Sequence, residues 1–184
     1  NFYFMKSAIT VFCLFVLIAA PLAAEKPVTQ AKHSTDEIKL DGQLDEPIWA
    51  NAMKAGTDML QYEPRQGVPM SQKTEFKVVY DDHNIYFGIV AYDTEPQKIV
   101  ASVMERDEVP FYDDSLFLAI DTMNDNRNGY VLWTNPNGIK YDASVTNNSS
   151  LNVQWDGIWD VKAVRTKDGW QAEIRLPFST VRHR

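Results

Sequence analysis

The sequence predicts an all-β fold, an antiparallel sandwich of two sheets of the jelly-roll or immunoglobulin-like kind. Three observations support this prediction. From about residue 38 onward, apolar residues recur with a period of two rather than 3.6, which is typical of strands with one buried face. Asn-Gly and Asp-Gly pairs, which tolerate the positive φ angles of hairpin turns, separate the alternating runs. No long amphipathic helix is predicted, and short strands joined by frequent tight turns favour a sandwich.

The chain opens with the layout of a secretory signal peptide. Lys6 supplies a positive charge, residues 8–20 are almost uninterruptedly apolar, and small residues follow as far as Ala24. This apolar run is shorter than the roughly 20 residues that span a bilayer. We therefore expect residues 1–24 to be a cleaved signal peptide, with residues 1–4 read through from upstream of the true start. The protein is then exported, to the periplasm, the outer membrane or the outside of the cell.

Residues 25–37 are polar, and we expect them to form a flexible linker. A turn and a short helix are predicted next. Asp41-Gly42 is a turn signal because glycine adopts positive φ without steric cost. Asp45 is expected to cap the helical turn, with Pro47 in its first turn. The residues expected on the apolar face of this turn, at i and i+4 spacing, are Ile48, Trp49, Ala52 and Met53.

Six strands are predicted from the alternation. They fall at residues 76–80, 85–91, 116–120, 139–145, 159–163 and 170–176. Turn signals lie at residues 81–84, Asn128-Gly129, Asn137-Gly138 and Asp168-Gly169. The run 85–91 is apolar on both faces, which predicts a central strand. The segment 147–151 is polar without a period and is predicted to be a loop, and residues 178–181 are predicted to form a short helical turn.

Composition and charge restrict the classes of function. The formal net charge is −7, whereas binding to nucleic acid calls for a basic face. The only cysteine, Cys13, lies in the predicted signal peptide, so we expect no disulfide in the mature chain. His33, His83 and His183 are scattered, and no Ser/His/Asp order or H-E-x-x-H motif is present. The sequence therefore predicts a protein without catalytic activity.

Six motifs, taken in order, resemble the family 9 carbohydrate-binding module over residues 38–182. They are LDGQLDEPIW at 40–49, TEFKVVYDD at 74–82, IYFGIVAYD at 85–93, Arg106-Asp107 followed by DDSLFLAIDT at 113–122, Asn135-Pro136-Asn137-Gly138, and DGWQAEIRLP at 168–177. The resemblance implies a β-sandwich of two antiparallel sheets that binds sugars without catalysis, by aromatic stacking. It also implies bound calcium in some members.

The chain is most similar to a subgroup of large exported bacterial proteins in which this module is N-terminal. The resemblance implies that a long β-rich, barrel-forming region follows the module, and we expect the chain to continue past residue 184. Its implied partners are a polysaccharide or oligosaccharide and that C-terminal region. The resemblance also implies a parent protein linked to polysaccharide degradation or uptake.

A sugar site requires exposed aromatic rings beside planar polar groups, because sugar C–H faces stack on rings and sugar hydroxyls need hydrogen bonds. Trp49 and Trp170 lie on clear apolar faces and are expected in the core. Trp155 lies in a loop-like stretch with polar neighbours, and Trp133 precedes a turn. Trp159 begins an alternating strand, a position that also suits the core. The predicted carbohydrate-binding residues are Trp155, Trp133, Trp159, Arg106, Asp107 and Asn135.

The segment 121–129 is rich in the hard oxygen ligands that calcium prefers. Asp121, Asn124 and Asp125 are the candidate ligands for Ca²⁺. The segment lacks the spacing of a helix–loop–helix calcium loop, and a long hairpin turn explains the same residues without a metal.

Two other functions remain open from the sequence. The sandwich could be a structural or docking domain of an outer-membrane protein without sugar binding, which burial of Trp133, Trp155 and Trp159 together would favour. It could also be a haem-binding relative with Met104 or Met123 as the axial ligand, although no c-type attachment motif is present.

Overall fold

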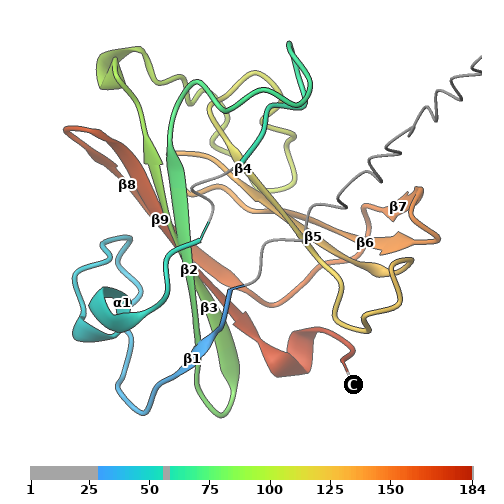
Figure 1. Ribbon diagram of the computed structural model, residues 1–184. Helices are drawn as coiled ribbons and strands as arrows, with labels where there is room; N and C mark the ends of the chain where they lie inside the picture. The colour runs from blue at the N-terminus through green and yellow to red at the C-terminus, as the bar shows by residue number, and fades with distance from the viewer. Residues whose placement is uncertain (1–28, 56–58, 184) are drawn as a thin grey trace, which may run out of the picture.

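The computed structural model describes residues 29–55 and 59–183, which form two β-sheets packed face to face (Figure 1). The five-stranded sheet has the order β1 (Lys32–His33), β2 (Thr74–Tyr80), β3 (Asn84–Tyr92), β9 (Gly169–Pro177), β8 (Asp160–Thr166). The four-stranded sheet has the order β4 (Leu116–Ile120), β5 (Gly129–Thr134), β6 (Tyr141–Thr146), β7 (Ser150–Asn152). All neighbouring strands are antiparallel except β1 and β2. The predicted all-β sandwich is confirmed.

Helical structure is confined to three short segments of the described chain, α1 (Pro47–Asn51), η1 (Pro96–Lys98) and η2 (Phe178–Thr180). None of the described helices has the length and apolar character needed to cross a membrane. The predicted signal peptide, residues 1–24, lies outside the described residues, as does the predicted linker up to residue 28. Within that predicted linker, β1 pairs with the end of β2.

The six predicted runs correspond to β2, β3, β4, β6, β8 and β9, and β3 is a central strand as its two apolar faces predict. The sequence missed β1, β5 and β7. β5 reads Gly-Tyr-Val-Leu-Trp-Thr, and its four consecutive large side chains give no period of two. β7 is a polar three-residue edge strand inside a segment predicted to be a loop.

The core lies between the sheets and follows the strand alternation. Its buried members include Val78, Phe87, Leu132, Ile174 and Leu176. Burial of each such side chain contributes about 1.5–3 kcal/mol. Trp49 and Trp170, both predicted in the core, are 0% and 3% exposed.

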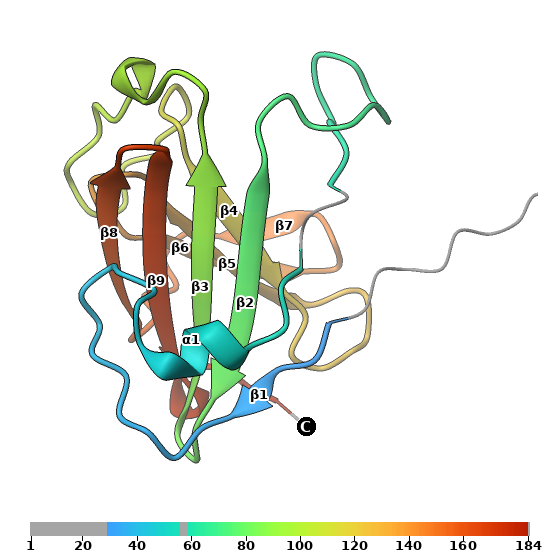
Figure 2. The ribbon, with the colours of Figure 1, turned by 60° about the vertical axis from the view of Figure 1, so that its left-hand side comes forward.

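The outer face of the five-stranded sheet is covered by residues 38–52, and Figure 2 shows α1 lying across it. Trp49 packs where β3 has Gly88; a Cβ there would lie 2.9 Å from the indole and 2.8 Å from Leu44. Glu173 of β9 accepts hydrogen bonds from Trp49 Nε1 at 3.0 Å and from the backbone N–H groups of Asp41 and Gly42 at 2.9 and 2.7 Å. Burial raises the pKa of the Glu173 carboxyl despite these bonds. The opening motif thus serves to cover the sheet.

The predicted helix cap is wrong in one detail. Glu46 rather than Asp45 occupies the N-cap position of α1, and its side chain makes no capping hydrogen bond. Pro47 does begin the helix, as predicted. The segment is short enough that packing of Ile48 and Trp49, both buried, determines its position.

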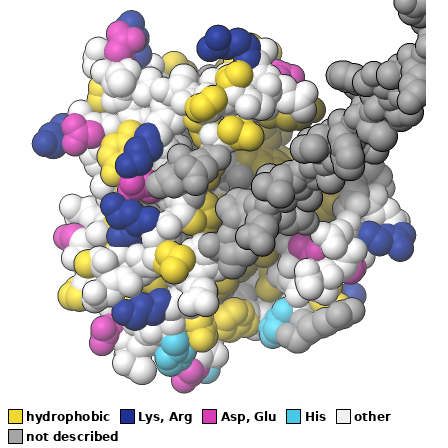
Figure 3. Space-filling model, viewed as in Figure 1, with side chains coloured by type: hydrophobic (Ala, Val, Ile, Leu, Met, Phe, Trp, Pro, Cys, Tyr) yellow, Lys and Arg dark blue, Asp and Glu magenta, His cyan; other side chains and the backbone are white. Residues whose placement is uncertain are grey.

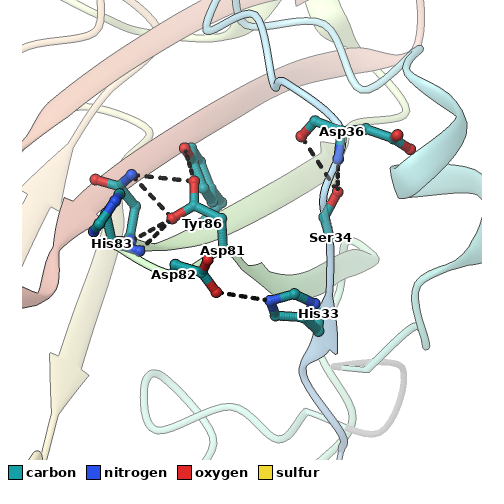
Figure 4. A network of polar contacts seen from close by, with 8 residues as sticks. His33, Ser34, Asp36, Asp81, Asp82, His83 and Tyr86 are labelled. Atoms are coloured by element: carbon teal, nitrogen blue, oxygen red, sulfur yellow. Dashed lines mark hydrogen bonds and ion pairs between the residues drawn. The ribbon is translucent and has the colours of Figure 1, made fainter.

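The β2–β3 turn is ordered by one carboxylate (Figure 4). Asp81 accepts hydrogen bonds from the His83 N–H at 2.7 Å, the Tyr86 hydroxyl at 2.8 Å and the Asn84 N–H at 2.6 Å. Burial opposes ionisation of Asp81, yet these donors together lower its pKa to about 2. Beside it, His33 of β1 lies 3.2 Å from Asp82, which joins the N-terminal strand to this turn.

Candidate functional site

The outer face of the four-stranded sheet carries a row of aromatic side chains. Phe117 of β4, Trp133 of β5 and Tyr141 of β6 are direct neighbours in the strand register. Their rings meet edge to face, with centroids 5.3 Å apart for the first pair and 5.8 Å for the second. Phe117 is 57% exposed and the other two side chains are half-buried. We call these three residues the aromatic face.

Strand alternation explains why these rings point outward. Leu116, Leu118 and Ile120 of β4 pack against the core, so Phe117 between them faces away from it. On β5, Leu132 is buried in the core and Trp133 lies on the opposite side. The indole Nε1 of Trp133 is buried and has no hydrogen-bond partner within the described chain.

The loop that precedes β4 adds two more exposed rings at the same end of the sheet. Phe111 is 73% exposed and Tyr112 is 89% exposed, with ring centroids 5.7 Å apart. Asp113, the next residue, accepts hydrogen bonds from the Ser102 N–H at 2.8 Å and the Val103 N–H at 3.0 Å. Burial opposes ionisation of Asp113, but its hydrogen bonds lower its pKa to about 2. The exposed rings therefore stand on a fixed loop.

Asn135 was predicted to bind sugar, but it has a structural role. The side chain is fully buried and donates to Val103 O at 2.9 Å and to Asp113 Oδ2 at 2.7 Å. Its Oδ1 accepts from the Asn137 N–H at 2.9 Å, which closes the β5–β6 turn. With donors and acceptor all used, Asn135 fixes the loop beneath Phe111 and Tyr112 instead of contacting a ligand.

Trp159 and Arg106 both bind the buried carboxylate of Asp142. Trp159 is 1% exposed, so it cannot offer a ring face to a sugar, and its Nε1 donates to Asp142 Oδ2 at 2.8 Å. Arg106 approaches the same oxygen at 3.0 Å and also pairs with Asp156. Because Asp142 is buried, Arg106 is needed to neutralise it. Asp107 is exposed, and its backbone N–H donates to Lys140 O at 2.9 Å.

Trp155 lies apart from the aromatic face. It is half-buried, its ring lies 4.7 Å from that of Tyr130, and it lines a cleft at the other end of the four-stranded sheet. Tyr130 and Trp133 are three residues apart on β5, roughly 10 Å, and their side chains lie on opposite faces. The predicted sugar-binding residues are therefore divided between two places.

The residues predicted to bind calcium form a turn. Asp121 accepts from the backbone N–H groups of Met123 at 3.1 Å and Asn126 at 2.8 Å. Asp125 accepts from the Asn128 N–H at 2.8 Å and its side chain at 2.7 Å, and Asn124 adopts a φ of 52°. Across residues 29–55 and 59–183, no group of three or more His, Cys, Asp or Glu side chains is placed to hold a metal ion. The residues fit a long hairpin turn better than a calcium site.

Four exposed or half-buried aromatic residues were not predicted as site residues: Phe111, Tyr112, Phe117 and Tyr141. The signal for Phe117 was present, because alternation within the run 116–120 places its leucines inward and Phe117 outward. Nothing in the sequence distinguishes the exposure of Phe111 and Tyr112, which depends on how Asn135 and Asp113 hold the loop.

One family model, described as Carbohydrate family 9 binding domain-like, matches residues 40–184. Similar solved structures include a family 9 carbohydrate-binding module from Caldicellulosiruptor kristjanssonii in complex with glucose, 18% identical, with a TM-score of 0.56 over 81% of this chain and 68% of that one. A structure of such a module from the same organism in complex with cellotriose is 19% identical, with a TM-score of 0.52 over 80% and 67%. A putative carbohydrate-binding protein from Bacteroides uniformis is 11% identical, with a TM-score of 0.62 over 82% and 72%. At these identities the similarity shows the fold. No curated protein matches the chain significantly.

Proposed function

Because the chain belongs to the Carbohydrate family 9 binding domain-like family, we propose that it binds carbohydrate and that the aromatic face is its binding surface. Domains of this family are non-catalytic carbohydrate-binding modules, so no bond is made or broken. The observation that supports this surface most is the row of three rings on adjacent strands, in which the exposed Phe117 contacts Trp133 and Trp133 contacts Tyr141. Related modules in complex with glucose and cellotriose support a sugar of that kind as the ligand.

The chemistry of the aromatic face suits a sugar chain. The C–H face of a pyranose lies against exposed rings, and sheet-borne rings lose little entropy when a ligand binds. Phe111 and Tyr112 add two exposed rings in the loop before β4.

Affinity electrophoresis through gels that contain xylan, soluble cellulose derivatives or mixed-linkage glucan tests this proposal. We expect retarded migration of the wild-type protein in at least one glycan and weaker retardation of Phe117→Ala. Ile158→Ala is the matched control, because Ile158 is a large exposed apolar residue remote from the aromatic face. Migration unaffected by every glycan, with a folded protein, would contradict the proposal.

One observation favours the alternative of a docking domain. A largely apolar groove of about 350 Å³ runs between the sheets beside the edge strand β4. Figure 3 shows hydrophobic side chains gathered between the two layers on this side of the molecule. The groove is lined by residues such as Met59, Met70, Phe76, Leu116 and Trp170. Since Trp133 and Trp155 are both partly exposed, sugar binding remains the better-supported function.

The cellular setting is also a proposal. The residue pattern of 1–24 supports export to the periplasm, the outer membrane or the outside of the cell. The resemblance to large exported proteins supports a module joined to a β-rich C-terminal region and linked to polysaccharide degradation or uptake. N-terminal sequencing of the protein recovered from a bacterial periplasm tests the first part: a start at residue 25 supports it, and an intact N-terminus contradicts it.

A further inference from the structure

A second hollow lies at the end of the four-stranded sheet remote from the aromatic face. Its volume is about 470 Å³, and it opens between the β4–β5 loop, the end of β6 and the segment after η2. Figure 1 shows this loop and the C-terminal segment at the same end of the molecule. We call it the Trp155 cleft. The residues that line it include Thr122, Asp125, Tyr130, Ser144, Trp155 and Arg182.

One wall of the Trp155 cleft is a fixed aromatic shelf. Trp155 and Tyr130 pack with ring centroids 4.7 Å apart and planes tilted by 42°. Gly157 makes room for the indole, because a Cβ at that position would lie 2.5 Å from its Cη2 atom. The Gly157 N–H is itself bound to buried Asp142 at 2.9 Å. The ring is thus held in place before any ligand arrives, which lowers the entropic cost of binding.

The C-terminal segment adjoins this shelf and is tied to the cleft by its backbone. The N–H of Arg182 donates to the Tyr130 hydroxyl at 3.0 Å, and the Thr122 hydroxyl donates to Arg182 O. The Arg182 guanidinium is exposed, and among the described residues it forms no ion pair with a carboxylate. The side chain is therefore free to donate to a bound molecule.

The polar groups of the cleft select a neutral ligand with several hydroxyls. Arg182 brings one positive charge and Asp125 one negative charge, so neither an anion nor a cation is favoured by net charge. Ser144 adds a hydroxyl that both donates and accepts, and the Thr122 hydroxyl, whose hydrogen is bound to Arg182 O, adds an acceptor. An aromatic shelf beside such a mixture of donors and acceptors is the chemistry that recognises the C–H face and the hydroxyls of a sugar ring.

We propose that the Trp155 cleft is a second carbohydrate subsite that takes one neutral pyranose ring independently of the aromatic face. One ring cannot touch both places, because Trp155 packs on Tyr130 at the start of β5 and Trp133 lies at its end on the opposite face. The module then contacts two separate sugar units, which raises its avidity for a polysaccharide presented as many chains. This inference does not depend on sugar binding by the aromatic face.

The five tryptophans of the chain provide the experiment, since each gives one indole N–H signal in a two-dimensional ¹H–¹⁵N NMR spectrum. Single Trp→Phe variants assign the signals. The probes are glucose, xylose, galactose, mannose and cellotriose, titrated one at a time. We expect at least one of them to shift the Trp155 signal saturably, both in the wild-type protein and in Phe117→Ala. A Trp155 signal unmoved by all five probes would overturn the inference, and so would a shift that is lost in Phe117→Ala.

Two further variants separate the cleft from the rest of the protein. Arg182→Gln removes the free guanidinium and is expected to weaken binding at Trp155 about tenfold, the effect of one charge-assisted hydrogen bond. Ile158→Ala, a nearby exposed control, is expected to leave both signals and their titrations unchanged. A Trp133 signal that does not move while the Trp155 signal does would contradict the proposed role of the aromatic face and support the cleft.

Discussion

The outer faces of the two sheets differ in what covers them. On the five-stranded sheet, residues 38–52 cross the strands, and Trp49 is fully buried against Gly88 and Glu173. On the four-stranded sheet, Phe117 stands on the outer face with more than half of its surface exposed, beside Trp133 and Tyr141. Aromatic side chains thus stabilise the fold on the outer face of the five-stranded sheet, whereas those on the outer face of the four-stranded sheet remain available to a ligand.

Trp49→Ala is expected to have the largest effect and tests the covered face. Removal of the buried indole should lower the free energy of unfolding by about 3–5 kcal/mol, since a cavity forms and Glu173 loses a hydrogen-bond donor. Urea denaturation followed by circular dichroism measures it. Met53→Ala, on the exposed side of the same segment, should change the value by less than about 0.5 kcal/mol. Equal effects of the two variants would mean that residues 38–52 do not cover the sheet as described.

Gly88→Ala tests how closely residues 38–52 pack on the five-stranded sheet. A Cβ at position 88 meets Trp49 and Leu44 at less than 3 Å, so we expect a loss of about 1–3 kcal/mol in the free energy of unfolding. Lys162→Ala, at an exposed position of β8 on the same outer face, is the control and should be nearly neutral. An unchanged free energy of unfolding for Gly88→Ala would show that residues 38–52 can move away from the sheet.

Asp81→Asn should lower stability at neutral pH by about 1–2 kcal/mol, because the folded protein holds the pKa of Asp81 near 2 against an ordinary value of 3.8. A carboxyl group whose pKa is lowered by folding stabilises the folded protein at pH values above its ordinary pKa of 3.8. That contribution to the free energy of unfolding is lost as the pH falls from 3.8 toward 2. The difference between wild type and variant should therefore shrink over this range. Urea titrations at pH 7, 4 and 2.5 measure it, and a difference that is constant with pH would contradict the assignment.

The smallest change in the free energy of unfolding is expected for a substitution on the aromatic face. Phe117→Ala should alter the free energy of unfolding by less than about 1 kcal/mol, because the ring is largely solvated. Thermal unfolding followed by calorimetry measures it against the wild type. A loss as large as that of Trp49→Ala would place Phe117 in the core and remove the contrast between the two faces.

The sequence predicted the strands better than the site, for physical reasons. Alternation is a local property, so runs such as 170–176 could be assigned without knowledge of their neighbours. The exposure of a tryptophan depends on distant residues: Trp155 and Trp159 are four residues apart, yet Trp159 is buried among core residues from both sheets, with its Nε1 bound to Asp142. Asn135 and Arg106 likewise look like ligand-binding residues until their partners in the fold are known.

Isothermal titration of cellotriose into the wild-type protein and into Phe117→Ala tests the central claim most directly. If the aromatic face binds carbohydrate, cellotriose binds to the wild-type protein with measurable heat. Phe117→Ala binds cellotriose at least about tenfold more weakly at its Trp133 site, while its unfolding temperature stays unchanged. Equal affinity of the two proteins for cellotriose, with the Trp133 indole signal unmoved in both, would contradict it.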